Sequence, residues 1–446
     1  MVSMTATLRK DLSAPGLIRA LRQQFSRIVD HRRQASIRYT LTDTMCAALA
    51  MFQFKFASLL QFDEACRSDD VRIRNLRRLY ELNEVASDTE MRKILDPVSP
   101  SELRQAFRAV HSLAQRGKVL EDFSVLDGRF VLAIDGTGQF ASNKIRCPQC
   151  CTKKRRDGTE QFYHQMLAAV IVHPEQKTVL PLDFEPIVNA DGENKNDCER
   201  NAAKRLLASI AAHYPKRQFI VTEDGLASNG PHIQLLLDYG MDFIIGIKPG
   251  GNPSLFEIMQ ERWSTDAVVE AEEELEDGTR RGYRFSNQMP LNRSHPELLV
   301  NMLEYWVVDK KGKVTNFSWI TNLTIRAENV HELAEFARSR WHIENETFNI
   351  IKHHGYHFEH NYGHGEKHLA SLLGGLMLLA FLCDQIQSHS CACFQAARKK
   401  VRVQKTLWEI MRSILILIDV PDWETLWRRI FDPDSLEPAQ ALNDTS

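Results

Sequence analysis

Apolar residues recur at intervals of three and four positions through residues 1–125, for example in LIRALRQQFSRIV and SPSELRQAFRAVHSLAQRG. This spacing predicts amphipathic helices. Basic residues crowd parts of the same region, as in RIRNLRRLY, and a basic helical face is typical of DNA docking. A solvated helix surface explains the same charges, and from the charge runs alone we favour that explanation. We predict a helical domain over residues 1–125, with DNA binding as its expected role.

The pattern changes at about residue 128. Three strand-like runs follow one another, RFVLAIDG, YHQMLAAVIVHP and TVLPLDFEPI. Helix-like and strand-like segments then alternate: KNDCERNAAKRLLASIAAHY, QFIVTED, GPHIQLLLDYG and DFIIGIKPGG, and after an interval a long helix is expected over roughly 328–353. Three consecutive strands followed by this alternation is the order of an RNase H-like sheet. We therefore predict an α/β fold: an RNase H-like mixed sheet with flanking helices.

The alternation stops between Lys248 and about Ile325. This stretch contains an acidic segment, EAEEELEDGTRRG, and the strand-like pieces LEYWVVD and VTNFSWITNL. We interpret it as a β-rich insertion before the last catalytic helix. The predicted organisation is therefore a first part of the catalytic core, the insertion, the last helices of the core, and a C-terminal helical region with a disordered tail: residues 126–248, 249–325, 326–388 and 389–446.

Composition is that of an ordinary globular protein, with 43% apolar and 26% charged residues among 446. The net charge of −2 means that any DNA-binding surface is local. Nine cysteines without framework spacing predict a reducing cytosol. The N-terminus lacks the apolar segment of a signal peptide. The most apolar run, residues 369–383, is short for a bilayer span, so we expect a buried helix and no membrane association.

Two of the strand-like runs end in an aspartate followed by small residues, Asp135 before Gly-Thr-Gly and Asp224 before Gly-Leu-Ala-Ser. An acid followed by small residues is unsuited to the hydrophobic core. It suits a metal-binding edge of the sheet, because small residues let the backbone approach a ligand closely. A third acid lies in RSRWHIENETFNIIK. Glu344 shares a helix face with Arg340 and is preferred, while Glu346 points to another side and stays an alternative. Three converging carboxylates supply the hard oxygen ligands that a pair of Mg²⁺ ions needs.

With these motifs the chain resembles bacterial insertion-sequence transposases of the DDE class, in or near the insertion-sequence-4-like group. Members carry the first aspartate in a motif like IDGT, matched at Asp135, and the second in a motif like DGxxS, matched at Asp224 and Ser228. The resemblance covers about residues 128–370 and, more loosely, the helical N-terminus. The motifs are specific as a set, whereas each alone is not.

The third acid of the family lies in a helix of the form Y-x2-R-x3-E-x6-K. Arg340 and Glu344 fit this spacing and stand in the related RxRWxIE form. The tyrosine position holds Ala337, and Lys352 comes one residue late. Counted from Glu346 instead, the lysine is one residue early, so the motif leaves both glutamates open.

The resemblance implies that Asp135, Asp224 and Glu344 are catalytic and hold two divalent ions, Mg²⁺ or Mn²⁺. It also implies DNA as partner, both as terminal inverted repeats of the element and as target DNA, with a dimer on DNA in the bacterial cytosol at the nucleoid. For Trp341, core packing is favoured over support of an unstacked base. The expected DNA-binding residues are Arg340, Lys352, Trp341, Ser228 and Asn229.

Cysteines and histidines raise a second metal question. Cys147 and Cys150 form a CxxC knuckle that could hold half of a zinc site, beside a basic run at 153–156. No second CxxC exists, and His164, Cys198 and His173 are the candidate partners. A reduced pair in a turn is favoured over zinc. Six histidines follow in HHGYHFEHNYGHGEKH, and we favour a polar loop there, either facing DNA or solvated, over a metal site.

The leading functional hypothesis is a DDE transposase that cuts DNA at the ends of its own element and joins them to new DNA. A metal-dependent nuclease without strand transfer is the first alternative. A catalytically inactive DNA-binding relative is the second, and the presence of all three acids argues against it. A third alternative, a metal-dependent phosphohydrolase that acts on small substrates, agrees less well with the sequence, because it leaves the basic helical N-terminus and the insertion unexplained.

Overall fold

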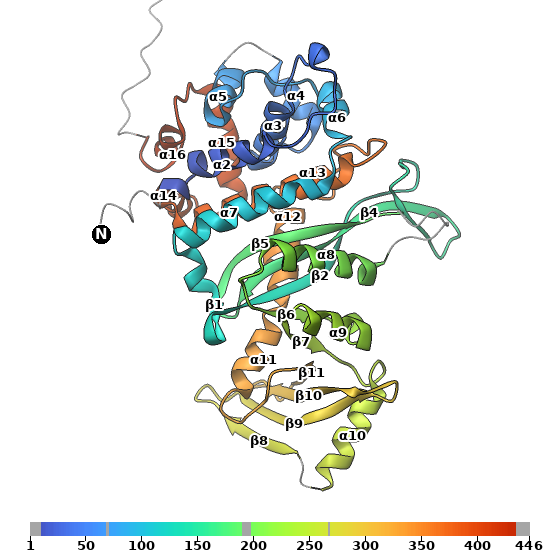
Figure 1. The fold of residues 1–446 in the computed structure, drawn as a ribbon. Helices are drawn as coiled ribbons and strands as arrows, with labels where there is room; N and C mark the ends of the chain where they lie inside the picture. The colour runs from blue at the N-terminus through green and yellow to red at the C-terminus, as the bar shows by residue number, and fades with distance from the viewer. Residues whose placement is uncertain (1–9, 68–70, 190–197, 266–267, 434–446) are drawn as a thin grey trace, which may run out of the picture.

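The computed structural model describes residues 10–67, 71–189, 198–265 and 268–433. Figure 1 shows three parts in succession: a helical bundle, a central part built on a β-sheet, and a β-rich part at the opposite end. Both ends of the chain contribute helices to the bundle. The disordered tail expected at the C-terminus falls on residues 434–446 and lies outside the described residues.

Helices form the N-terminal region, as the apolar spacing predicts. α3 is buried along nearly its whole length, and the Thr40 side chain caps it by accepting a hydrogen bond from the Asp43 N–H. The basic helix α5 instead has one buried face and packs against C-terminal helix α15. The helices of the N-terminal region are α2 (Ala14–Phe25), α3 (Leu41–Gln53), α4 (Leu59–Cys66), α5 (Val71–Tyr80), α6 (Asp88–Leu95) and α7 (Arg104–Arg116). The helices of the C-terminal region are α13 (Leu369–Ser390), α14 (Ala392–Lys400), α15 (Gln404–Leu417) and α16 (Trp423–Phe431).

α13 joins the bundle to the sheet. By length and composition it could cross a membrane, but 89% of its most apolar window is buried in the protein, against α3 and β5 among others. The predicted buried helix over residues 369–383 is therefore confirmed. Glycine permits the close approach to the sheet, because a Cβ on Gly375 would lie 2.2 Å from Cζ of Phe184.

The central sheet has the RNase H-like order that the sequence predicts. The strands lie in the order β5-β4-β2-β6-β7, in which β5, β4 and β2 are antiparallel neighbours and β2, β6 and β7 are parallel neighbours. The connections to β6 and β7 run through α8 and α9. Their bounds are β2 (Arg129–Ser142), β4 (Glu160–His173), β5 (Gln176–Ile187), α8 (Glu199–His213), β6 (Phe219–Glu223), α9 (Gly230–Asp238) and β7 (Asp242–Gly246).

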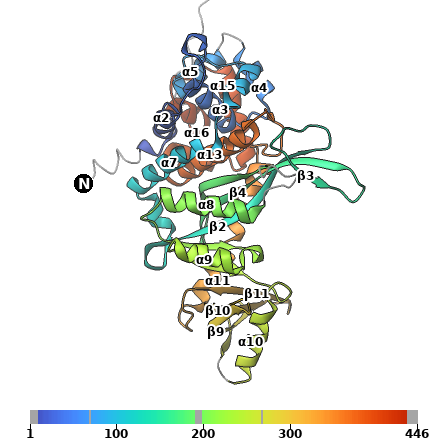
Figure 2. The same ribbon diagram turned by 45° about the vertical axis from the view of Figure 1, so that its right-hand side comes forward.

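Two short strands complete this part of the sheet. β1 (Ser124–Val125) pairs with β2, and β3 (Cys151–Lys154) pairs with β4. Figure 2 shows β3 and the end of β4 reaching away from the body of the protein. The sequence does not predict β3, because a CxxC turn precedes it and its residues, buried at Cys151 and exposed at Lys153 and Lys154, lack the alternation of a half-buried strand.

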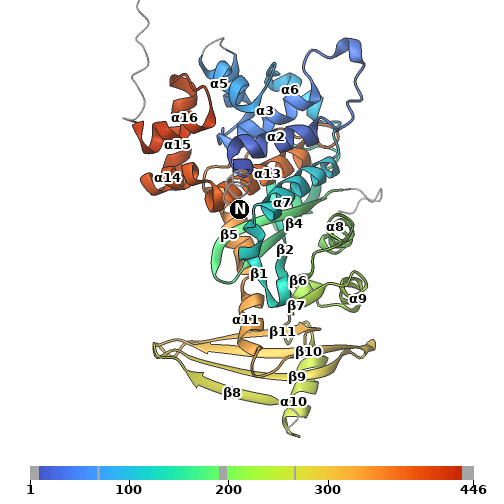
Figure 3. The same cartoon turned by 60° about the vertical axis from the view of Figure 1, so that its left-hand side comes forward.

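The insertion is β-rich, as expected, and it continues the sheet. β11 pairs antiparallel with β7, so the insertion and the core form one sheet of 11 strands. Figure 3 shows this outer part of the sheet face on, with α10 packed against it. The elements are α10 (Pro253–Trp263), β8 (Val269–Glu274), β9 (Arg280–Asn292), β10 (His295–Val308) and β11 (Val314–Thr321).

The long helix expected over 328–353 is interrupted. α11 (Val330–Arg338) ends in a turn at Ser339 and Arg340, a π-helix, η6 (Ile343–Phe348), follows, and α12 (Asn349–His353) ends the segment. The Ser339 hydroxyl donates to the Phe336 carbonyl at the break. Apolar periodicity does not reveal such a change, because a π-helix differs from an α-helix by one residue per turn at most.

Candidate active site

The register of two parallel strands brings Asp135 and Asp224 together. Ala133 on β2 lies opposite Thr222 on β6. Each aspartate comes two positions later in its own strand direction, so both reach the same level and the same face just beyond the last paired residues of β2 and β6. Asp224 directly follows β6, as expected, but Asp135 does not end its strand, because β2 continues beside β4 as far as Ser142. The two aspartates therefore converge through strand pairing.

Arg340 connects the first and third acids. Its Nη1 lies 2.7 Å from Oδ2 of Asp135 and 2.8 Å from Oε1 of Glu344. The π-helix that carries Glu344 packs against β2 and β5. Of the two candidate third acids, Glu344 is thus the one placed beside Asp135, whereas Glu346 lies near the His342 ring.

The pKa of Asp135 shows that the charges of the other two acids act on its carboxylate. Its pKa is raised to about 6, chiefly because the carboxylate is largely buried. The charges of Glu344 and Asp224 add to the rise, while Arg340 and the Gly136 N–H, which donates at 2.8 Å, oppose it. Clustered carboxylates of this kind favour binding of a cation.

The turn after β6 presents Asp224 to solvent. Its carboxylate accepts from the Leu226 N–H at 2.9 Å. Ser228 and Asn229, which were expected to bind DNA, hold the turn itself: the Ser228 hydroxyl donates to the Gly225 carbonyl, and the Asn229 side chain caps α9. In this structure both side chains position Asp224.

Glu199 is a fourth carboxylate that sequence reasoning missed. A Cβ on Gly136 would lie 2.4 Å from its Oε1, so glycine after Asp135 makes room for it. The pKa of Glu199 is raised by burial and by the charge of Asp224. The sequence does not predict this role for Glu199, because acidic residues are common in the first turn of a helix, where they interact favourably with the helix dipole.

Trp341 corrects an expectation. Core packing was favoured, but the indole is 62% exposed. The buried face of α11 runs through Val330, Leu333 and Ala337, and an unbroken helix would place Trp341 next on that face. The turn at Ser339 and Arg340 ends this periodicity and turns the side chain outward.

Lys352 does not join the three acids. Its ammonium lies 3.2 Å from Glu359 in an ion pair within the same segment. Basic side chains that line the same cleft as Asp224 include Arg340, Arg338 and Lys248. Lys248, at the end of β7, was not singled out from the sequence because a lysine after a strand is common at a protein surface.

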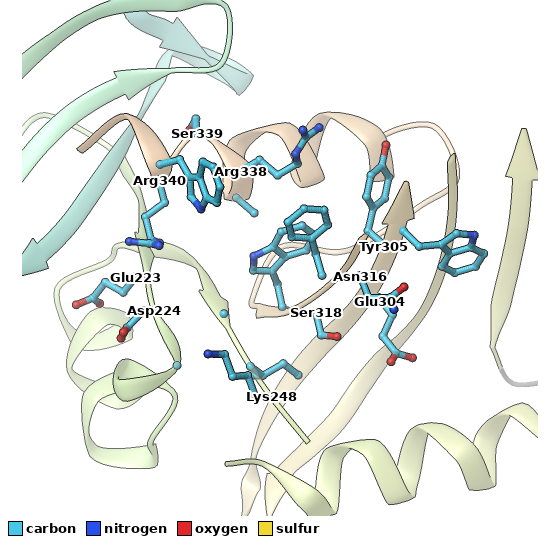
Figure 4. A pocket seen from close by; sticks show the side chains of 18 of the residues that line it. Glu223, Asp224, Lys248, Glu304, Tyr305, Asn316, Ser318, Arg338, Ser339 and Arg340 are labelled. Carbon is cyan, nitrogen blue, oxygen red and sulfur yellow. The ribbon is translucent and has the colours of Figure 1, made fainter. Parts of the chain in front are cut away.

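An open cleft of about 1410 Å³ begins at Asp224 and extends to the insertion. Figure 4 shows Asp224 and Arg340 on one side and Lys248 below, facing strands of the insertion. Phe317 and Trp319, stacked with their rings 5.4 Å apart, come from β11. The cleft therefore carries charges of both signs beside aromatic rings. Its walls include the basic residues Lys248, Arg284, Arg338 and Arg340, the aromatic residues Phe317, Trp319 and Trp341, and the acids Glu223, Asp224, Glu270, Glu304, Glu335 and Glu346.

A separate cluster lies where β3 and β4 leave the body of the sheet. It consists of Cys147, Cys150, His164 and His364, whose four ligand atoms all lie within 4.8 Å of one another. The hydrogen bond between the thiols lowers the pKa of Cys150 to about 7 and raises that of Cys147. His164 was among the expected partners of the knuckle, and Cys198 is not in the cluster.

His364 was missed, because the histidine-rich segment was interpreted as a polar loop without a metal role. Its Nδ1 lies 3.4 Å from Sγ of Cys150 and 3.3 Å from Nε2 of His164. The link spans 214 residues of sequence. No local spacing rule connects residues so far apart, so only the fold reveals the fourth member.

Comparisons with known proteins identify the family of the chain. No curated protein matches the chain. Among solved structures, the cryo-EM structure of the piggyBac transposase synaptic complex with hairpin DNA is similar, with a TM-score of 0.40 and 12% identity over 97% of this chain and 83% of that chain. Residues 128–382, more than half of the chain, match the model of the transposase DDE domain. The chain therefore belongs to the family of transposases with a DDE domain.

Proposed function

We propose that this protein cuts DNA at the terminal inverted repeats of its own insertion sequence and joins the ends to target DNA. The observation that supports the proposal is that Asp224 lines the cleft and that Arg340, which lines it too, contacts both Asp135 and Glu344. Carboxylates supply the reaction centre, and the cleft supplies a surface suited to phosphates and bases. Membership of the insertion-sequence-4-like group, as the sequence motifs suggest, is part of the same proposal.

The donor set suits two Mg²⁺ or Mn²⁺ ions. All three side chains offer hard oxygen atoms, and Arg340 already holds one positive charge between Asp135 and Glu344. When bound, such ions supply activation of water or a DNA 3′-hydroxyl and stabilisation of the leaving oxygen in an in-line displacement. Asp224, exposed and held by its turn, completes the set.

The chain's own cations and rings position DNA. Arg340 and Arg338 can contact phosphates through their planar guanidinium groups, and Lys248 as a point charge. Trp341 offers an exposed indole face on which an unstacked base can rest. Lys352 is available to a phosphate once its ion pair with Glu359 opens.

Joining two ends to one target requires both ends in one complex, so we propose a dimer on DNA that acts in the bacterial cytosol. The test uses purified full-length protein and DNA that carries the flanks of the gene, with Mg²⁺, Mn²⁺ or EDTA. Asp135→Ala is the test variant, and Asp238→Ala, an exposed carboxylate on α9, is its matched control.

Metal-dependent cuts at the element boundary that Asp135→Ala abolishes and Asp238→Ala retains are the expected result. Joined products with a supercoiled target plasmid then distinguish a transposase from a nuclease without strand transfer. Cleavage that survives Asp135→Ala overturns the catalytic assignment. Specific binding of the flanks without any cleavage identifies an inactive DNA-binding relative instead.

A further inference from the structure

Cys147, Cys150, His164 and His364 come from three separate segments. The two cysteines lie in the turn before β3, His164 lies on β4, and His364 lies in the segment between α12 and α13. The side chains of Cys150 and His164 are buried, and those of Cys147 and His364 are half-buried. Four soft or borderline ligands that converge from distant parts of the chain differ from a chance surface cluster.

The distances agree with a tetrahedral centre. Zinc–sulfur bonds of about 2.3 Å and zinc–nitrogen bonds of about 2.0–2.1 Å place the ligand atoms of a tetrahedron roughly 3.3–3.8 Å apart. The two Sγ atoms are 3.6 Å apart, and Nε2 of His164 lies 3.3 Å and 3.4 Å from them. The two imidazole nitrogens are 3.3 Å apart. Every one of these separations fits an edge of the tetrahedron.

We propose that Cys147, Cys150, His164 and His364 bind one Zn²⁺ ion that fixes the segment after the catalytic helix against the edge of the sheet. Four protein ligands leave no open position, so the ion is structural and takes no part in the phosphoryl chemistry. It is distinct from the carboxylate centre, which offers only oxygen ligands.

The loop around His364 is built to present this side chain. Gly363 and Gly365, with φ of 133° and 67°, bend the backbone on either side of it. Beyond the bend, the Asp96 carboxylate accepts backbone N–H groups of Glu366 and Lys367. The segment is thus tied to the helical bundle on one side, and zinc would tie it to β4 on the other.

The position of His364 indicates what a bound zinc ion would stabilise. The segment leads from the helix of Glu344 to α13, and Phe140 at the end of β2 packs edge-on against the His364 ring at 5.0 Å. A fixed His364 therefore connects the strand of the first acid with the segment that follows the third acid. The ion also fixes the turn before the basic strand β3.

The first test is the metal content of purified full-length protein. Elemental analysis after gel filtration is expected to give about one zinc per chain, in line with a closed four-ligand site. Cobalt substitution is expected to give the intense visible bands of a tetrahedral ion and sulfur-to-metal charge transfer, and X-ray absorption of the zinc protein is expected to show two sulfur and two nitrogen ligands. Zinc-free protein that binds neither Zn²⁺ nor Co²⁺ after reduction overturns the proposal.

Variants then assign the ligands. Cys150→Ser and His364→Ala are expected to lose the zinc, while the exposed controls Cys198→Ser and His354→Ala keep it. Zinc retained in both ligand variants overturns the assignment, and the X-ray absorption of the wild type decides the ligand set even if a variant does not fold. Asp135→Ala is expected to keep its zinc, so failure of this proposal and failure of the proposed catalysis give different results.

Discussion

The guanidinium of Arg340 lies 2.7 Å from the Asp135 carboxylate, although 205 residues separate them in the chain. The same nitrogen contacts Glu344. Without it, the half-buried carboxylate of Asp135 and the exposed carboxylate of Glu344 would have no positive charge between them. Arg340 therefore supplies the positive charge between these acids, and the proposed divalent ions, once bound to them, would free its guanidinium for a phosphate.

Replacing this arginine is expected to make the fold more dependent on divalent metal. In Arg340→Met the acids repel one another, so Mg²⁺ or Mn²⁺ should raise the melting temperature more than it does in the wild type. Cleavage should fall on the order of a hundredfold, since a positioned charge near the reacting phosphate is lost. Differential scanning fluorimetry with a metal titration measures the first effect.

Arg338→Met is the matched control for the metal titration. Arg338 lines the same cleft, but its ion pair, at 2.7 Å, is with Glu335, whereas Arg340 pairs with Asp135 and Glu344. Its metal-dependent shift in melting temperature should equal that of the wild type. An equal shift in all three proteins would show that Arg340 does not substitute for a metal ion.

The choice between the two glutamates in the WHIENETF motif can be decided directly. Glu344→Gln should reduce cleavage by on the order of 10³-fold or more, because it removes a carboxylate of the proposed metal-binding set. Glu346→Gln should keep cleavage within a few-fold of the wild type, because Arg340 connects Asp135 with Glu344 and not with Glu346. Single-turnover cleavage at saturating DNA measures both, and the reverse order of effects would reassign the third acid.

The sequence predicts the meeting of Asp135 and Asp224 well, because strand pairing determines it. Asp135 and Asp224 end two apolar runs, and parallel neighbours bring their carboxyl ends together in any RNase H-like sheet. Glu199 and Lys248 reach the same edge from a helix start and a strand end with no distinctive local pattern. His364 likewise joins its cluster through a contact that only the folded chain makes.

The displaced lysine has an explanation in the π-helix. The family motif places a lysine seven positions after the glutamate, and this chain has Lys352 eight positions after Glu344. η6 takes one more residue per turn than an α-helix, so it absorbs the surplus residue and returns Lys352 to nearly the same helical face. Counting residues from Glu344 to Lys352 assumes a uniform α-helix, so the count alone indicates that the lysine is displaced from the family position.

The exposed indole of Trp341 should contribute to DNA binding and little to stability. Stacking of a base on an aromatic ring is worth about 1–3 kcal/mol, so Trp341→Ala should weaken binding of single-stranded or distorted end DNA by roughly five- to 150-fold. Its melting temperature should stay close to that of the wild type, because the side chain is 62% exposed. Trp263→Ala, an exposed tryptophan on α10 outside the cleft, is the control. Equal loss of affinity in both variants would remove Trp341 from the DNA-binding surface.

A buried ion pair connects the bundle with α13 and should be sensitive to loss of one partner. Lys55 Nζ lies 2.6 Å from Asp384, which also accepts from the Tyr356 hydroxyl. Asp384→Asn leaves the Lys55 charge without its counterion in the core and should destabilise by about 3–5 kcal/mol. Arg78 and Asp419 form an exposed pair, so Asp419→Asn should cost no more than about 1 kcal/mol. Chemical denaturation compares the two, and similar costs would contradict a buried charge pair.

The buried pair of His232 and Glu223 predicts a stability change with pH. Burial disfavours the charged imidazole, but Glu223, whose Oε2 lies 2.6 Å from Nε2, outweighs burial and raises the pKa of His232 above its ordinary 6.5. Arg200 and Lys204 on α8 act in the opposite direction and leave the net rise in place. The contribution of the pair is therefore fully present below about pH 6.5 and is lost as the pH rises through the folded-state pKa.

The variant His232→Asn isolates this contribution. The difference in unfolding free energy between the wild type and this variant should be larger at about pH 6 than at about pH 9, since only the protonated imidazole forms the ion pair. His354→Asn, an exposed histidine, should show no such trend. Urea denaturation at three pH values measures the differences. A constant difference for His232→Asn across that range would mean that the histidine is neutral in the fold and that Glu223 holds it by a neutral hydrogen bond alone.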